Sequence, residues 1–199
     1  LDRKGDLTGA IAEYREAIRL DPKNVRTHNA LGWALQRKGD LDEAVAVYER
    51  AIRLDPKYAL VRSNLASALL EKDDLAGAIA EAREAIRLDP ADVVGLNARA
   101  DAFHGKGELD RAIADYDEAL RLDSENVTAF FRRGLIYRLR ADPVRAIADY
   151  SEAIRLQPSD PTFFHDRGRA YHDAGDLDRA IADHDEAIRL APSEPNFFH

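Results

Sequence analysis

The side chains best suited to metal chemistry are histidines in the last third of the chain. His165 and His172 lie seven residues apart, which places them two turns apart on one face of a helix. His199 repeats the position of His165 one period of 34 residues later. With Asp166 and Asp173 nearby, these imidazoles are of the type that binds transition metals. Two histidines two turns apart cannot both bind one ion, so we interpret them as a polar surface and expect no metal.

Motifs of the common enzyme classes are absent from the sequence. The segment 104–107, His-Gly-Lys-Gly, lacks the earlier glycine and the Ser or Thr of a phosphate-binding loop. There is no His-Glu-x-x-His zinc motif and no Gly-x-Ser-x-Gly nucleophile turn. Glu13 and Glu16 alternate with Arg15 and Arg19, as on a solvated helix face. We therefore expect neither an enzyme nor a bound cofactor.

The residues around these candidates repeat every 34 positions. A fixed period of this length predicts a stacked array of helix–turn–helix units. Such arrays usually bind other molecules along an extended surface. The residues that mark the period are Pro22, Pro56, Pro90, Pro158 and Pro192, then Ala10, Ala44, Ala78, Ala112, Ala146 and Ala180, and then Ala17, Ala51, Ala85, Ala119, Ala153 and Ala187.

Within each period the pattern describes two helices. In the first helix a small residue such as Gly32 precedes a large one, Leu35, by three positions, so both lie on one helical face where a second helix can approach. The second helix carries alanine, an aromatic residue and alanine, as at Ala44, Tyr48 and Ala51. With the closing proline, this pattern resembles the tetratricopeptide repeat (TPR) family over essentially the whole chain.

The resemblance implies an all-α fold, a right-handed superhelical solenoid of helix–turn–helix repeats. It also implies a single array over residues 1–199. Because both ends fall inside a repeat, we expect a fragment of a longer protein. The expected units are a partial repeat at 1–24, full repeats at 25–58, 59–92, 93–126, 127–160 and 161–194, and the start of a further repeat at 195–199.

The turn inside each unit carries its own signals. Gly39 is expected to close a first helix, because glycine adopts the left-handed conformation that ends helices. Asp40 with Glu43 fits a capping box at the start of the second helix. In a later unit Asp142 precedes Pro143, and proline is well tolerated in a first helical turn.

Composition excludes several other classes of protein. The chain of 199 residues is 45% hydrophobic and 33% charged, as in a soluble array with a core. No apolar run approaches the ~18 residues of a membrane span, and no export leader is visible, so we expect no membrane association and a cytoplasmic location. The net charge of −8 argues against nucleic acid as a partner. The preference for arginine over lysine suggests a bacterial source.

The resemblance places the first helices on the inner, concave wall, where TPR arrays hold peptides. Exposed apolar and aromatic residues bordered by arginine are typical of binding surfaces. The alternative is that some of these side chains, including Trp33 and Leu135, pack against a neighbouring unit. The candidate groove residues are Arg26, Asn29, Trp33, Arg37, Leu60, Asn64, Asn97, Phe131, Arg132, Leu135, Arg138, His165, Arg169 and His172.

The first helices are basic in sum, whereas the second helices and the turns are acidic. An acidic protein is thus expected to have a basic groove. Such a groove would favour acidic or C-terminal peptide segments through charge-assisted hydrogen bonds. It should be most basic at Arg132, Arg133, Arg138 and Arg140.

Two positions of the repeat change together along the chain, which predicts that they are in contact. Where the first becomes arginine the second becomes aspartate, so we expect partly buried ion pairs, because an unpaired buried charge is costly. The couples are Leu31 with Val47, Leu65 with Glu81, Arg99 with Asp115, Arg133 with Asp149, and Arg167 with Asp183.

These observations predict a protein–protein interaction scaffold that binds a peptide or partner segment in its groove. One alternative is a regulatory or substrate-recruiting arm of a larger enzyme. Another is an engineered array, suggested by the lack of Met and Cys and by the change of repeat style after Pro90. Internal-type apolar surface on the last second helix also predicts head-to-tail self-association, with Phe197 and Phe198 near the junction.

Overall fold

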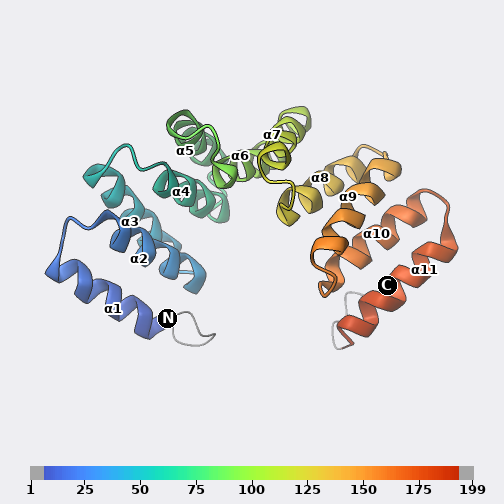
Figure 1. The fold of residues 1–199 in the computed structure, drawn as a ribbon, viewed down its shortest axis with the longest axis horizontal. Coiled ribbons are helices and arrows are strands. Elements are labelled where there is room, and N and C mark those ends of the chain that lie inside the picture. Colours follow the sequence, from blue (N-terminus) through green and yellow to red (C-terminus); the bar gives the residue numbers. More distant parts are fainter. Residues whose placement is uncertain (1–6, 193–199) are drawn as a thin grey trace. The chain divides into compact units, whose positions relative to one another are not determined.

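The computed structural model describes residues 7–192, and this range contains helices and no strand (Figure 1). The expected all-α repeat fold is therefore confirmed. His199, a candidate metal ligand from the sequence, and Phe197 and Phe198, predicted near a self-association junction, lie outside the described residues. The helices are α1 (Leu7–Leu20), α2 (Val25–Lys38), α3 (Leu41–Leu54), α4 (Ala59–Glu71), α5 (Leu75–Leu88), α6 (Val93–Gly105), α7 (Leu109–Leu122), α8 (Val127–Leu139), α9 (Pro143–Leu156), α10 (Pro161–Asp173) and α11 (Leu177–Leu190).

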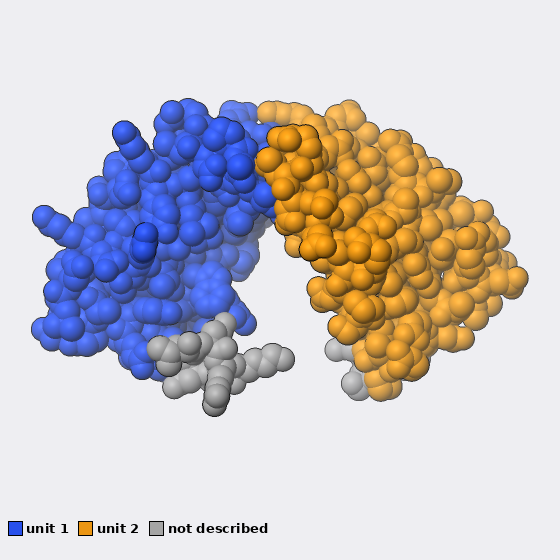
Figure 2. Space-filling view, in the orientation of Figure 1, with its two compact units in different colours: residues 1–108 blue, residues 109–199 orange. Residues whose placement is uncertain are grey.

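The chain divides into two compact units, residues 1–108 and residues 109–199 (Figure 2). In the first unit α2 packs on α3, α4 packs on α5, and α4 also contacts α6. In the second unit α8 packs on α9, α10 packs on α11, and α10 also contacts α8. Each unit is thus built from helix pairs, with first helices in contact from one pair to the next.

Close packing within a pair depends on small residues in the first helix. A Cβ added to Gly32 would lie 2.5 Å from the ring of Tyr48, which is fully buried. The ring therefore fills the space that any side chain at Gly32 would need. One repeat later Ala66 packs in a cluster with Ala82, where a methyl group replaces the ring. The predicted close approach at these small residues is confirmed.

The turn between paired helices uses the left-handed conformation. Gly39, Gly107 and Gly175 have φ values of 91°, 74° and 81°, as expected for residues that close helices. Asp73 and Ala141 occupy the same place in the intervening repeats, with φ values of 62° and 54°. The turn geometry is thus kept where glycine is missing, at the cost of a strained backbone.

The predicted capping box at Asp40 does not form. Its side chain makes no capping hydrogen bond to α3, and Oδ2 instead lies 2.6 Å from Nζ of Lys38. The neighbouring ammonium group competes successfully for the carboxylate. By contrast, Asp142 caps α9 as a hydrogen-bond acceptor for a first-turn N–H at 3.1 Å, with Pro143 in the first turn.

Candidate functional site

The candidate residues lie on the first helices of both units. We call these two surfaces the first-helix faces. That of the first unit comprises Arg26, Asn29, Trp33, Arg37, Leu60, Asn64 and Asn97. That of the second unit comprises Phe131, Arg132, Leu135, Arg138, His165, Arg169 and His172.

In the first unit this face exposes large apolar side chains. Trp33 is 40% exposed and Leu60 is 39% exposed. The guanidinium of Arg37 lies over the indole of Trp33, 4.9 Å from the ring centroid, which is within cation–π range. Arg26, on the same helix, is also exposed. An aromatic surface bordered by arginine is therefore present on α2.

The amide side chains of this face connect neighbouring first helices. Asn64 Nδ2 donates a hydrogen bond to Asn29 Oδ1 at 2.9 Å, which links α4 to α2. Gln36 Nε2 donates to Glu71 Oε1 at 2.7 Å between the same helices. Asn97 is half-buried. Asn29, Gln36 and Asn64 therefore take part in contacts that link α2 to α4.

In the second unit the aromatic part of the face is more enclosed. The ring of Phe131 lies between those of Tyr150 and Phe163, with centroid distances of 5.9 and 5.0 Å. Leu135 is half-buried and packs against the same cluster, whereas Arg132 is exposed. Leu135 thus packs inside the second unit, as the alternative interpretation predicted, whereas Trp33 is 40% exposed.

The C-terminal part of this face is a cluster of charged groups. Arg138 Nη1 lies 3.7 Å from Asp173 Oδ2, and Arg169 Nη1 lies 3.9 Å from Asp166 Oδ1. Burial raises the pKa of Asp166, although Arg138, His165 and Arg169 act in the opposite direction. Positive groups of α8 and α10 thus meet the carboxylates of α10 at 3.7 and 3.9 Å, longer than a charge-assisted hydrogen bond.

The candidate histidines within residues 7–192 do not converge as a metal centre would require. His165 packs against His184, with ring centroids 5.1 Å apart, and burial lowers its pKa. His172 points into solvent with 71% of its side chain exposed. The imidazole of His184 lies beside Gly168, in the place that Tyr48 takes beside Gly32, so it acts as a packing group. Within residues 7–192 no three His, Asp or Glu side chains are grouped to hold a metal ion.

Two of the predicted arginine–aspartate couples are confirmed. Arg133 donates two hydrogen bonds to Asp149 at 2.7 and 2.8 Å, and Arg167 does the same to Asp183. Burial raises the pKa of Asp149 despite its arginine partner. The third couple joins residues of different units and stays a prediction.

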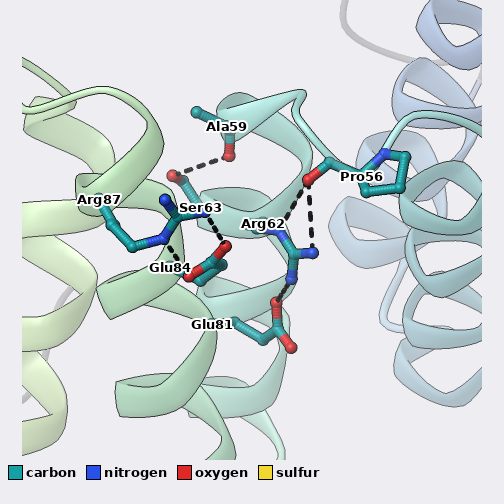
Figure 3. Close-up of polar contacts among 7 residues, drawn as sticks. All are labelled: Pro56, Ala59, Arg62, Ser63, Glu81, Glu84 and Arg87. Atoms are coloured by element: carbon teal, nitrogen blue, oxygen red, sulfur yellow. Dashed lines mark hydrogen bonds and ion pairs between the residues drawn. The ribbon is translucent and has the colours of Figure 1, made fainter.

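Glu81, which was coupled with Leu65 in the sequence, pairs instead with an arginine on α4, as Figure 3 shows. Glu81 accepts a hydrogen bond at 2.6 Å from Arg62, which stands one turn before Leu65 on α4. Arg62 also faces the carbonyl of Pro56 at 3.4 Å. This pair was missed from the sequence, and its one signal is that Glu81 stands where later repeats have the shorter aspartate.

The basic surface is smaller than the sequence predicted. Arg133 is hydrogen-bonded to Asp149, and Arg140 Nη2 donates a hydrogen bond to Asp110 at 2.6 Å. Acidic side chains of the second helices therefore neutralise two of the four arginines. Arg132 is exposed on the first-helix face, and Arg138 lies beside Asp173 at 3.7 Å.

Comparison with known families decides what the repeat is. Profiles described as tetratricopeptide repeat match residues 29–93 and 161–194, and one described as TPR repeat matches residues 3–39, 100–138 and 145–175. The chain belongs to the tetratricopeptide repeat family. A comparison with curated protein sequences gave no match.

Solved TPR structures share the fold at low sequence identity. A thermophilic TPR protein of Thermus thermophilus is 23% identical with a TM-score of 0.73, over 87% of this chain and 95% of that one. A TPR protein of Parabacteroides merdae is 24% identical with a TM-score of 0.75, over 98% and 77%. YrrB, described as a TPR protein with an unusual peptide-binding site, is 18% identical with a TM-score of 0.67, over 94% and 96%.

The TPR helices are short and mixed in polarity. None of those in the described range is long and apolar enough to cross a membrane.

Proposed function

We propose that this TPR chain is a protein-interaction scaffold whose first-helix faces bind extended, acidic segments of partner proteins. The observation that carries the proposal is Trp33, which is 40% exposed with the Arg37 guanidinium over its ring. Tryptophan and arginine are the residue types that contribute most often to binding hot spots. Membership of the TPR family supports an interaction role, because TPR repeats typically bind proteins or peptides.

The distribution of charge supports an acidic ligand. Neither α2 nor α8 contains an acidic residue, whereas Arg26 and Arg132 are exposed on them. The arginine in the last turn of a second helix has a carboxylate partner within its own helix, as Arg189 has in Glu186 at 2.5 Å. A carboxylate-bearing segment that contacts α2 or α8 therefore meets no acidic side chain of those helices.

The proposal is tested with two fluorescent peptides that share the same apolar residues. The acidic peptide carries Glu at the positions where the basic peptide carries Lys. We expect the acidic peptide to bind more tightly in an anisotropy titration, and to lose affinity between about 50 mM and about 500 mM NaCl as screening increases. Binding should also change the emission of Trp33, the single tryptophan of the chain.

Variants of the chain test whether the peptide binds to the first-helix face of the first unit. Arg26→Glu combined with Arg37→Glu should weaken the acidic peptide, whereas Arg189→Glu on α11 should have little effect. Equal affinity for the two peptides in the wild-type chain would refute the proposal.

A further inference from the structure

The second unit has a cavity of about 350 Å³ formed by the first turns of α8 and α10 and the loop before α10. Phe131 and Phe163 give it an aromatic lining. The exposed residues Thr128, Arg132 and Thr162 also line it. Ligand pockets have volumes of about 300–1,000 Å³, so this cavity suits one large apolar side chain within a polar surround.

The other end of the same two helices carries a loose ion pair. Arg138 of α8 and Asp173 of α10 are separated by 3.7 Å, whereas a charge-assisted hydrogen bond measures about 2.7–2.9 Å. Arg138 Nε is buried with no hydrogen-bond partner in the described part of the chain. Asp173 is 45% exposed, so it can move away from the arginine.

A comparison of two repeats shows how the surroundings of Arg138 differ from those of the matching residue in the first unit. In the first unit, Tyr48 donates a hydrogen bond to Gln36 Oε1 at 3.1 Å. Three repeats later the same positions hold Tyr150 and Arg138, so a donor replaces the acceptor. Tyr150 Oη is buried without a hydrogen bond of normal geometry to any described residue, and burial raises its pKa although the nearby Arg138 guanidinium acts to lower it. A ligand carboxylate would give the Arg138 guanidinium an acceptor at short distance, because its Nε has none among the described residues and its ion pair with Asp173 is long.

We propose that α8 and α10 bind an extended peptide in which a large apolar residue and an acidic residue stand three positions apart. Phe131 and Arg138 are seven residues apart, or about 10 Å along α8. In an extended chain of polyproline II type, three residues span about 9 Å, and the three-residue period keeps both side chains on the same side. The apolar side chain enters the cavity, and the carboxylate takes the place of Asp173 beside Arg138. This inference rests on the proposed function and names its ligand pattern in the second unit.

The test uses two fluorescent peptides of equal composition, with Leu and Glu either three positions apart or adjacent. Anisotropy titrations of the full chain should show at least about fivefold tighter binding of the spaced peptide, because only it reaches both anchors. Thr128→Trp fills the exposed mouth of the cavity and should weaken binding about tenfold. Thr8→Trp, an exposed threonine on α1, is the matched control.

Two further variants test the charged anchor. Arg138→Gln should remove the preference for the spaced peptide, whereas Asp173→Asn should strengthen binding because it removes the competing carboxylate. Equal affinity for both spacings, with acidic peptides still preferred over basic ones, overturns this inference and leaves the proposed function standing. Weaker binding by Asp173→Asn also overturns it. Loss of the acidic preference itself refutes the proposed function.

Discussion

Arg133 and Asp149 are joined by two hydrogen bonds, from Nε to Oδ2 at 2.8 Å and from Nη2 to Oδ1 at 2.7 Å. Arg133 also donates through Nη1 to Asp117 on α7. Asp149 is 5% exposed, whereas the side chain of Asp117 is 53% exposed. One guanidinium therefore connects α7, α8 and α9 of the second unit.

This arrangement predicts unequal effects for the two carboxylates. Asp149→Ala should lower the free energy of unfolding by about 3 kcal/mol, because it leaves a largely buried guanidinium without its main partner. Asp117→Ala should cost less than about 1 kcal/mol, as for exposed ion pairs. Denaturant titrations of both variants measure the difference. Equal losses would show that the buried couple is not the stronger contact.

The charge pairs show how far sequence reasoning extends. Arg133 with Asp149 could be predicted because two positions of the repeat change together. The ion pair of Arg62 with Glu81 could not be predicted in the same way. Its arginine lies one helical turn before the repeat position that Arg133 occupies in its own unit. The absence of the capping box at Asp40 could not be predicted from the sequence for a similar reason, because its carboxylate forms an ion pair with Lys38 two residues away.

The contact of Gly32 with Tyr48 predicts a strong coupling between the two positions. Gly32→Ala should destabilise the chain by about 1–3 kcal/mol, because the new Cβ would lie 2.5 Å from the tyrosine ring. In a Tyr48→Ala background the same change should be nearly neutral, as the pair Ala66 with Ala82 shows. A double-mutant cycle measures this coupling. Additive effects would contradict the steric explanation.

The strained turn residue Ala141 offers a stabilising change. With φ at 54°, it occupies a region that costs a non-glycine residue about 1–2 kcal/mol. Ala141→Gly should therefore raise the free energy of unfolding by about 0.5–1 kcal/mol, after the greater freedom of glycine in the unfolded chain is subtracted. The reverse change at Gly39, where φ is 91°, should destabilise. Thermal melts of the two variants should shift in opposite directions.

The buried carboxyl of Asp166 predicts a pH-dependent stability difference. Because its pKa is raised in the folded chain, the folded state binds a proton more readily, and this contribution to stability is lost as pH rises above the ordinary Asp value of 3.8. Asp166→Asn removes the effect, so the variant should gain stability over wild type as pH increases through this window. Denaturant titrations at several pH values test it. A difference that does not change with pH would argue against desolvation of Asp166.

The candidate site was only partly predictable. The exposure of Trp33 follows from its position on a first helix, which the period reveals. The enclosure of Leu135 and the cavity beside Phe131 depend on contacts with Tyr150 and Phe163 from other helices. Contacts between helices cannot be deduced from the spacing of residues within one helix.

Selection of a random peptide library by the full chain tests acidic-peptide binding on the first-helix faces most directly. The account predicts enrichment of Asp and Glu beside large apolar residues at about 50 mM salt, and loss of that enrichment at about 500 mM salt. Arg26→Glu combined with Arg132→Glu should abolish the enrichment, whereas Arg189→Glu should retain it. Selected peptides without an acidic preference, or with one that salt does not weaken, would contradict the account.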